Sequence, residues 1–298
     1  MSRQVQGYVY LALAMLTVGS TVVASKLIAS GLPPFSATAL RFAIAFPVLL
    51  LLMRATGARL PRFSRHDRLI LVIQAGAGSV GYTTLLISGL SLTSAADAGV
   101  IIGTLPVVSA AISILLLRER PQRALLLAVA LATAGVLSIA FTPDAAGGSL
   151  SGNALIFLAV VCEGLFILLN KRLKTEIAPL AQSTLMAGIG FIVAAIPAIF
   201  EAPFAHGISA SAVAAVVYYA LVPTVGGFLL WYAGAERVSG TEAALFTAVA
   251  PVSAVMLAFI ILGEPVGLSQ IAGIACVLAA VLGLAFAGSR SVKLAGGR

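Results

Sequence analysis

Residues 54–68 read RATGARLPRFSRHDR and contain five arginines, whereas residues 199–213 read IFEAPFAHGISASAV and contain no Lys or Arg. The two segments stand 145 residues apart, and the same shift aligns the rest of the chain with hardly a gap. One constant offset over this length predicts two repeats, residues 1–145 and residues 146–298. The shift superimposes Gly19 on Gly164, Lys26 on Lys171, Pro34 on Pro179, Gly81 on Gly226, Gly89 on Gly234, Pro106-Val107 on Pro251-Val252, Glu119 on Glu264 and Ala140-Phe141 on Ala285-Phe286.

The composition is that of a protein dissolved in lipid. Of the 298 residues, 60% are hydrophobic and only 9% are charged, against about 25% charged residues in a typical soluble domain. The mean hydropathy is +1.11, and the apolar residues recur along the whole length. This composition excludes a soluble enzyme, a disordered regulator and a disulfide-stapled secreted module, and it predicts the lipid bilayer as the surrounding medium.

The apolar residues fall into about ten stretches, each close to the ~20 residues that a spanning helix needs. We therefore predict an all-α membrane protein with ten transmembrane helices, arranged as two five-helix repeats. The first stretch is predicted to be a helix and not a signal peptide, because its apolar run is too long and belongs to the repeat. The stretches are 7–28, 35–53, 69–90, 94–117, 124–141, 152–170, 179–199, 211–233, 240–262 and 267–287.

The positive charges indicate how these helices are oriented. Sixteen of the 18 Lys and Arg residues lie in alternate loops or in the tails, which places the N- and C-termini in the cytoplasm by the positive-inside rule. The net charge of +8 therefore reports orientation, and we expect no nucleic-acid partner. Lys26 and Arg41 are the two exceptions. The sixteen are Arg3, Arg54, Arg59, Arg62, Arg65, Arg68, Arg118, Arg120, Arg123, Lys171, Arg172, Lys174, Arg237, Arg290, Lys293 and Arg298.

An odd number of helices in each repeat makes the second repeat enter the membrane upside down. The contrast between residues 54–68 and residues 199–213 agrees with that inversion. Inverted repeats are the plan of many secondary transporters, with the substrate site near the midplane between the halves. The alternative is a gene duplication that produced only a structural bundle.

Polar groups within the apolar stretches are the candidates for a site, because they are costly in a bilayer. Glu163 lies about mid-helix, where it can bind an amino group or carry a proton; the alternative is a protonated Glu bonded to a neighbouring helix. For Tyr218 and Tyr219 an interfacial belt is favoured over binding, whereas Tyr82 is deeper and favours a cavity. The predicted substrate cavity consists of Gln74, Ser79, Tyr82, Glu163, Thr224, Trp231 and Tyr232.

Two prolines and four charged residues suggest moving parts. Pro106 and Pro251 interrupt the fourth and ninth stretches at equivalent depths, and each is predicted to be a hinge, with a static kink as the alternative. Lys26 and Asp97 lie near the outer ends of two helices, and the 145-residue shift turns them into Lys171 and Glu242 at the inner ends. We expect these pairs to close alternate gates; simple snorkelling of the lysines is the competing explanation.

The sequence offers little support for an enzyme. His66 and His206 lie on opposite membrane sides, and the chain has no H-E-x-x-H, G-x-S-x-G or G-K-[ST] motif. Residues 76–81 spell G-x-G-x-x-G without the preceding strand that a dinucleotide site needs, so we expect them to allow close helix packing or to leave room for a cavity. Glu119 and Glu264 are predicted to be caps or ion-pair partners. We expect no enzyme activity, no cofactor and no metal.

The residues also carry a family resemblance. Gly19-Ser20 with Lys26, Pro33-Pro34 and Ala39-Leu40-Arg41-Phe42 resemble the opening hairpin of EamA-type proteins of the drug/metabolite transporter superfamily. Leu105-Pro106 with Leu117-Arg118-Glu119-Arg120, and Ala250-Pro251 with Gly263-Glu264-Pro265, resemble that family's helix–loop signature. The resemblance implies a ten-helix exporter of small metabolites in the cytoplasmic membrane, such as the amino-acid exporters of the YddG type. Carriers for sugar conjugates or lipid-related metabolites, and a pore or scaffold, are the alternatives.

Overall fold

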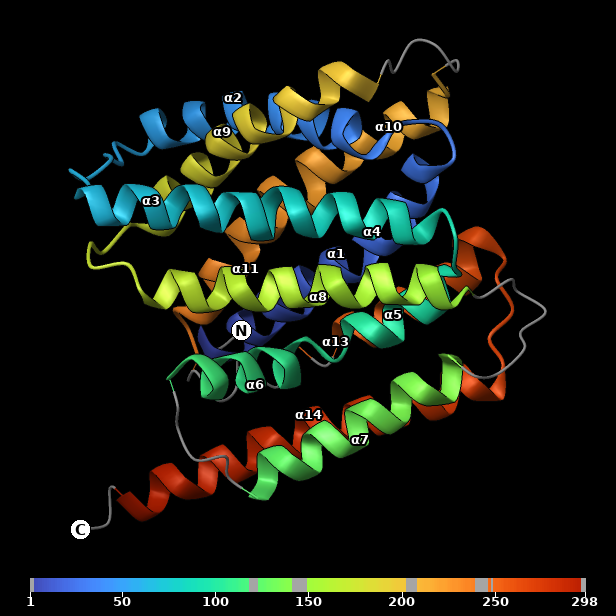
Figure 1. Cartoon of the computed structure of the whole chain (residues 1–298). Coiled ribbons are helices and arrows are strands. Elements are labelled where there is room, and N and C mark those ends of the chain that lie inside the picture. The colour runs from blue at the N-terminus through green and yellow to red at the C-terminus, as the bar shows by residue number, and fades with distance from the viewer. Residues whose placement is uncertain are drawn as a thin grey trace.

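The computed structural model describes residues 3–117, 123–140, 149–201, 208–238, 246–247 and 249–295, and every regular element in these ranges is helical (Figure 1). In chain order the elements are α1 (Arg3–Ala29), α2 (Pro34–Ala55), α3 (Arg65–Gln74), the π-helix η1 (Ala75–Gly81), α4 (Tyr82–Leu90), α5 (Ala95–Ile102), α6 (Leu105–Leu117), α7 (Arg123–Ala140), α8 (Leu150–Lys171), α9 (Pro179–Ala198), the 3₁₀-helix η2 (Ile199–Glu201), α10 (Ala210–Tyr219), the π-helix η3 (Ala220–Gly226), α11 (Gly227–Ala235), α13 (Val249–Leu257), the π-helix η4 (Ala258–Leu262) and α14 (Leu268–Ala295).

Several helical segments are long and apolar enough to cross a bilayer. Within the described ranges there are six: Arg3–Ala29, Pro34–Ala55, Arg65–Leu90, Leu150–Asn170, Pro179–Glu201 and Ala210–Ala235. Shorter apolar helices cover Leu126–Ser138, Val249–Leu262 and Leu268–Gly283. The all-helical prediction is confirmed for the described residues, and the count of ten spans stays a prediction.

The element boundaries repeat along the chain. The first residues of α2, α3, η1, α4 and α7 stand 145 positions before the first residues of α9, α10, η3, α11 and α14. Two of these matched pairs also pack against each other, α2 on α9 and α7 on α14. In each pair the two helices run in opposite directions (Figure 1).

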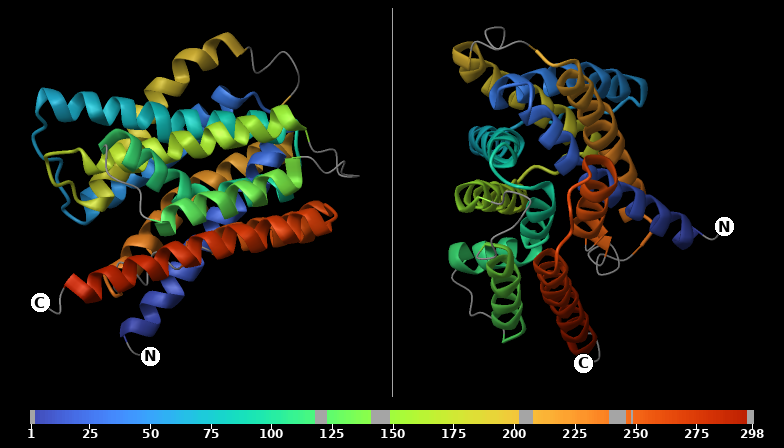
Figure 2. Two further views of the ribbon diagram at one scale, coloured as in Figure 1. Left: turned by 60° about the horizontal axis from the view of Figure 1, so that its bottom comes forward. Right: turned by 90° about the vertical axis from the view of Figure 1, so that its right-hand side faces the viewer.

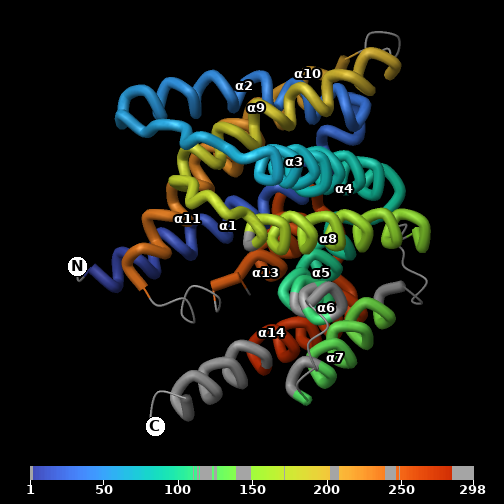
Figure 3. Tube along the Cα trace, turned by 60° about the vertical axis from the view of Figure 1, so that its left-hand side comes forward, coloured from blue at the N-terminus to red at the C-terminus, as the bar shows by residue number. Residues whose placement is uncertain are grey.

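The two matched pairs lie at opposite edges of the bundle. Figures 1 and 3 place α2 and α9 at one edge and α7 and α14 at the other, with α3, α4 and α8 between them. Helix α1 passes through the middle, where it contacts α4, α10, α11 and α13 (Figure 2). The interior of the bundle is therefore built around α1, and α5, whose eight residues are all buried, contributes much of the largest core cluster.

Local sequence explains where many of these helices begin. The Ser64 and Ser94 hydroxyls accept the backbone N–H groups of Asp67 and Asp97, each at 3.0 Å. This is the N-cap geometry that satisfies one of the free donors in the first turn. Helices α2 and α9 instead begin on a proline, whose missing N–H would have no partner at that position anyway.

Glu264 caps a helix from the other end of the sequence. Its two carboxylate oxygens accept the N–H groups of Ala95 and Ala96 at 3.0 Å each, at the start of α5. Negative charge at a helix N-terminus satisfies the free donors and interacts favourably with the helix dipole. Glu264 therefore joins the end of η4 to α5, whereas Glu119, its counterpart in the repeat, lies outside the described residues.

Glu201 and Asp67 make equivalent connections elsewhere. Glu201, at the end of η2, accepts the N–H groups of Phe35 and Ser36 at 3.0 and 2.7 Å, in the first turn of α2. Asp67 accepts the Lys174 N–H at 3.1 Å and the Thr175 hydroxyl at 2.7 Å, in the loop between α8 and α9. Each of these carboxylates joins a segment from residues 1–145 to a segment from residues 146–298.

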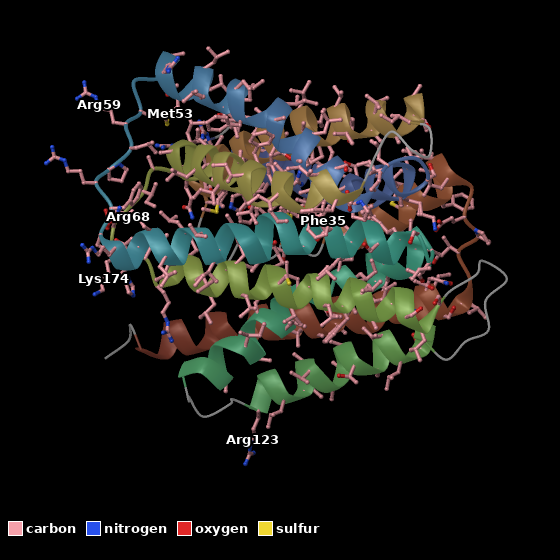
Figure 4. All side chains as sticks on the ribbon, turned by 45° about the horizontal axis from the view of Figure 1, so that its top comes forward. Phe35, Met53, Arg59, Arg68, Arg123 and Lys174 are labelled. Carbon is pink, nitrogen blue, oxygen red and sulfur yellow. The ribbon has the colours of Figure 1, made fainter. Side chains whose placement is uncertain are left out.

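Positive charge gathers at one end of the bundle. Figure 4 shows Arg59, Arg68 and Lys174 at the same end of the bundle as Met53, which lies in the last turn of α2. The C-terminal end of α14 lies at the same side of the molecule as the loop between α2 and α3 (Figure 1). This distribution agrees with the predicted cytoplasmic side, which itself stays a prediction.

Glycines allow the closest helix contacts. A Cβ on Gly78, inside residues 76–81, would lie 2.3 Å from the Phe166 ring of α8, so this segment does serve close packing. On α1, a Cβ at Gly19 would lie 1.9 Å from the Ser253 hydroxyl and 2.7 Å from the Ala250 carbonyl oxygen of α13. The second contact involves backbone, which a side-chain rotation cannot relieve.

We predict that Gly19→Ala lowers the free energy of unfolding by about 1–3 kcal/mol, because the added methyl overpacks α1 against α13. Thermal unfolding in detergent, followed as the monodisperse fraction by size-exclusion chromatography, measures the effect. Gly283→Ala is the control: a Cβ at that exposed helical position meets no atom within 4 Å. Equal melting temperatures for the two variants would contradict the prediction.

Candidate substrate-binding site

Arg41 is a buried cation within an apolar helix. It lies near the middle of α2, and 7% of its surface is exposed. The guanidinium Cζ stands 4.2 Å from the centre of the Phe42 ring and 4.5 Å from the centre of the Tyr219 ring, and Nη2 donates to the Ser79 carbonyl oxygen at 3.3 Å. Two aromatic faces can stabilise a desolvated guanidinium by about 2 kcal/mol or more.

Glu163 provides the opposite charge. It lies on the same face of α8 as the buried Ile156, Ala159 and Val160, so its side chain points into the bundle. Glu163 is half-buried. Glu163 interacts electrostatically with Arg41 across the bundle.

Tyr82 and Tyr219 complete the arrangement. Tyr82 begins α4, where it interacts electrostatically with Glu163, Arg41 and Tyr219, and its hydroxyl contacts that of Thr21 on α1. We call Arg41, Tyr82, Glu163 and Tyr219 the central cluster. Two of its members come from residues 1–145 and two from residues 146–298, so the cluster joins the two parts of the chain.

Two of the π-helices, η1 and η3, adjoin the central cluster. Tyr82 directly follows η1, Tyr219 directly precedes η3, and Ser79 lies within η1. The Ser79 carbonyl oxygen accepts the Thr83 hydroxyl at 3.0 Å as well as Arg41. Such π-helical segments are frequent at functional sites because they change which backbone groups are available for bonding.

The structure separates the predicted cavity residues into two groups. Tyr82, Glu163 and the backbone of Ser79 come together around Arg41. The other four make contacts elsewhere in the bundle. Gln74 Nε2 donates to the Phe166 carbonyl oxygen at 3.2 Å, and the Thr224 hydroxyl donates to the Tyr219 carbonyl oxygen at 2.9 Å. Trp231 packs on the cluster of Ala14, Met15 and Ala250, and Tyr232 stacks on Phe228 with ring centres 6.2 Å apart.

Arg41 and Tyr219 are members of the site that the predicted cavity does not include. The belt prediction is wrong for Tyr219, which is 4% exposed and packs on Arg41. Tyr218 is 39% exposed and donates a hydrogen bond to the Ser20 hydroxyl of α1 at 2.8 Å. A cation inside an apolar stretch was the available signal for Arg41, since such residues commonly mark functional sites.

The predicted hinge at Pro106 has a different geometry from the one expected. The stretch 94–117 is not one helix interrupted by a proline: α5 ends at Ile102, and α6 begins at Leu105 after a turn at Gly103 and Thr104. Pro106 and Pro251 both occupy the first turn of a helix, α6 and α13. That position tolerates proline, so the break before α6 comes from the turn itself.

The two residues of the predicted outer gate take different partners. Lys26 Nζ donates to the carbonyl oxygens of Leu90 and Thr93 at 2.8 and 2.6 Å, where it satisfies the C-terminal end of α4. The Asp97 carboxylate accepts the Gln270 side-chain amide of α14 at 2.9 Å. For the predicted inner gate, Lys171 is the last residue of α8, and Glu242 lies outside the described residues.

No group of three or more His, Cys, Asp or Glu residues in the described ranges has metal-site geometry.

The class of protein that the fold and site define is a multi-pass membrane protein whose halves enclose buried ionisable groups. Comparison with known families agrees: the model of the EamA-like transporter family matches residues 5–141 and again residues 150–286. The chain belongs to the EamA-like transporter family.

Individual relatives point the same way. The chain is 37% identical to the uncharacterized transporter YetK of Bacillus subtilis over 286 residues, which cover 94% of this chain and 86% of YetK. It is 28% identical to a probable terminal-alkyne amino-acid exporter of Streptantibioticus cattleyicolor, over 84% of each chain. A solved crystal structure shares the fold with a TM-score of 0.63 and 22% identity, over 97% of this chain and 98% of the other.

We predict that Tyr219→Leu destabilises the protein by about 1–2 kcal/mol more than Tyr219→Phe does, because only leucine removes the aromatic face beneath Arg41. The measurement is the midpoint of thermal unfolding in detergent for both variants. An equal loss in the two variants would show that the ring does not stabilise the guanidinium.

Proposed function

We propose that this protein is a secondary transporter that exports small amphipathic metabolites, with amino acids as the leading substrate class, across the cytoplasmic (inner) membrane. The observation that carries the proposal is the central cluster, in which Arg41 and Glu163 bring opposite charges from two parts of an apolar bundle. Ionisable groups are energetically costly inside the membrane, so they are expected where a polar solute is bound.

In this proposal transport follows alternating access. The ten-helix bundle, with both termini in the cytoplasm, divides into residues 1–145 and residues 146–298, and one half rocks against the other about the central cluster. The antiparallel packing of α2 on α9 and of α7 on α14 supports this arrangement (Figure 1). The protein's partners are then the bilayer and a small-molecule substrate, and no ATP is consumed.

Two observations favour amino acids among the possible substrates. A relative over 84% of both chains is a probable exporter of a terminal-alkyne amino acid. Independently, the central cluster contains one cation and one anion, which matches the two charges of an amino acid. A function like that of the YddG-type amino-acid exporters is consistent with both observations.

Counterflow in proteoliposomes tests the proposal. Vesicles loaded with an unlabelled amino acid are expected to accumulate the same labelled amino acid transiently, because a carrier exchanges substrate faster than it returns empty. Vesicles without protein are the control. Flux that shows no trans-stimulation would indicate a pore, and the absence of any flux would indicate a scaffold. Counterflow only with sugar conjugates or lipid-related metabolites would show that the substrates belong to those classes and not to the amino acids.

The gates can be tested with cysteine pairs in a background carrying Cys162→Ser and Cys276→Ser. One pair is Lys26→Cys with Asp97→Cys, and the other is Lys171→Cys with Glu242→Cys. We expect substrate to raise the cross-linking yield of one pair and to lower that of the other, because the two gates close alternately. Equal trapping of both pairs in every condition would contradict the gate assignment.

A further inference from the structure

We infer that Arg41 and Glu163 form one bipolar binding site, in which Arg41 binds the carboxylate of an α-amino acid and Glu163 binds its ammonium group. This inference rests on the proposed function and specifies how the substrate is recognised. It assigns the two ends of the substrate to α2 and to α8, which belong to different halves of the chain.

Arg41 has unused capacity to bind an anion. A guanidinium carries five N–H donors. The described contacts give it a hydrogen bond to the Ser79 carbonyl oxygen, at the long distance of 3.3 Å, a side-chain hydrogen bond with Tyr219, and the faces of two rings. Its Nε is buried and has no hydrogen-bond partner among the described residues. Since buried donors are nearly always paired, a ligand that accepts hydrogen bonds explains the arrangement.

The geometry of Arg41 also favours a planar anion. The rings of Phe42 and Tyr219 hold the guanidinium by its faces. A guanidinium fixed in this way keeps its edge for hydrogen bonding, and that edge matches the two oxygens of a carboxylate. A lysine ammonium at the same position would keep the charge and lose the forked geometry.

Glu163 is placed to accept the other end of the ligand. It lies on the inner face of α8 and is half-buried, and within the described part of the chain no hydrogen bond to its carboxylate is present. An ammonium group supplies three donors to such an acceptor. Tyr82, which interacts with both charged residues, adds a polar hydroxyl and an apolar ring beside them.

Charge balance separates a zwitterion from a simple anion. With Glu163 nearby, the site as a whole carries no net charge, so a ligand of net charge zero restores pairing at both residues. An inorganic phosphate or a phosphorylated metabolite would meet Arg41 and also be repelled by Glu163. The favoured ligand class is therefore the α-amino acid and not the phosphate ester.

The test measures ligand binding to the purified full-length protein by isothermal titration in detergent. The probes are the twenty common L-amino acids, then the deaminated and decarboxylated analogues of the tightest binder, and inorganic phosphate. We expect the amino acid to bind about tenfold or more tightly than either analogue, since each analogue leaves one buried charge unpaired. No binding by any of the twenty, or tighter binding of phosphate, would overturn the inference.

Variants assign each charge to its residue. In Arg41→Gln the amino acid and its decarboxylated amine are expected to bind alike, and in Glu163→Gln the amino acid and its deaminated acid are expected to bind alike. Arg41→Lys keeps the charge and serves as a second variant if Arg41→Gln does not fold. It is expected to bind the amino acid several-fold more weakly than the parent. Arg54→Gln, at an exposed position later in α2, is the control and should bind as the parent does.

The binding and counterflow experiments distinguish a failure of the bipolar site from a failure of the proposed transport function. Binding with the expected selectivity but no counterflow would refute transport and leave the bipolar site in place. Counterflow with unchanged selectivity in Arg41→Gln and Glu163→Gln would refute the bipolar site and leave the transporter in place.

Discussion

The bilayer offers no water to unpaired backbone groups, and this constraint shapes the whole molecule. Within helices the groups pair with one another, so the problem moves to the helix ends. Here the ends are satisfied by side chains from distant parts of the sequence. Glu264 and Glu201 accept the first N–H groups of α5 and α2, and Lys26 donates to the last carbonyls around α4. Each helix end thereby becomes a connection between segments.

The same constraint explains why the central cluster is informative. At the helix ends each charge meets the helix group of opposite polarity, and the pairing has a structural purpose. Arg41 is different, because its ring contacts and its hydrogen bonds to Ser79 and Tyr219 leave Nε unpaired among the described residues. In a bundle whose helix ends are satisfied by distant side chains, this unpaired donor is the observation that supports the proposed ligand site.

Much of this fold was predictable because the signals are local or periodic. The apolar stretches, the 145-residue offset, the serine caps at Ser64 and Ser94 and the N-terminal proline of α2 are all visible in the sequence. The site was harder, because its contacts join residues far apart in the chain: Arg41 meets Tyr219. An interfacial tyrosine and an interior tyrosine have the same sequence context, so the sequence favours a belt position for Tyr219. The break before α6 has no clear signal in the sequence either, because apolar residues continue through Gly103.

Backbone symmetry and side-chain asymmetry have separate consequences in this molecule. The π-helices η1 and η3 occupy equivalent positions in the two repeats, so both halves carry the same irregular backbone beside the centre. The side chains do not repeat, and a charged or polar ligand therefore meets different groups on the two sides. In the proposed mechanism, a symmetric frame would let either half move in an equivalent way, whereas an asymmetric cluster would bind a bipolar ligand in one orientation. The equivalents of Arg41, Tyr82, Glu163 and Tyr219 are Met186, Gly227, Val18 and Gln74.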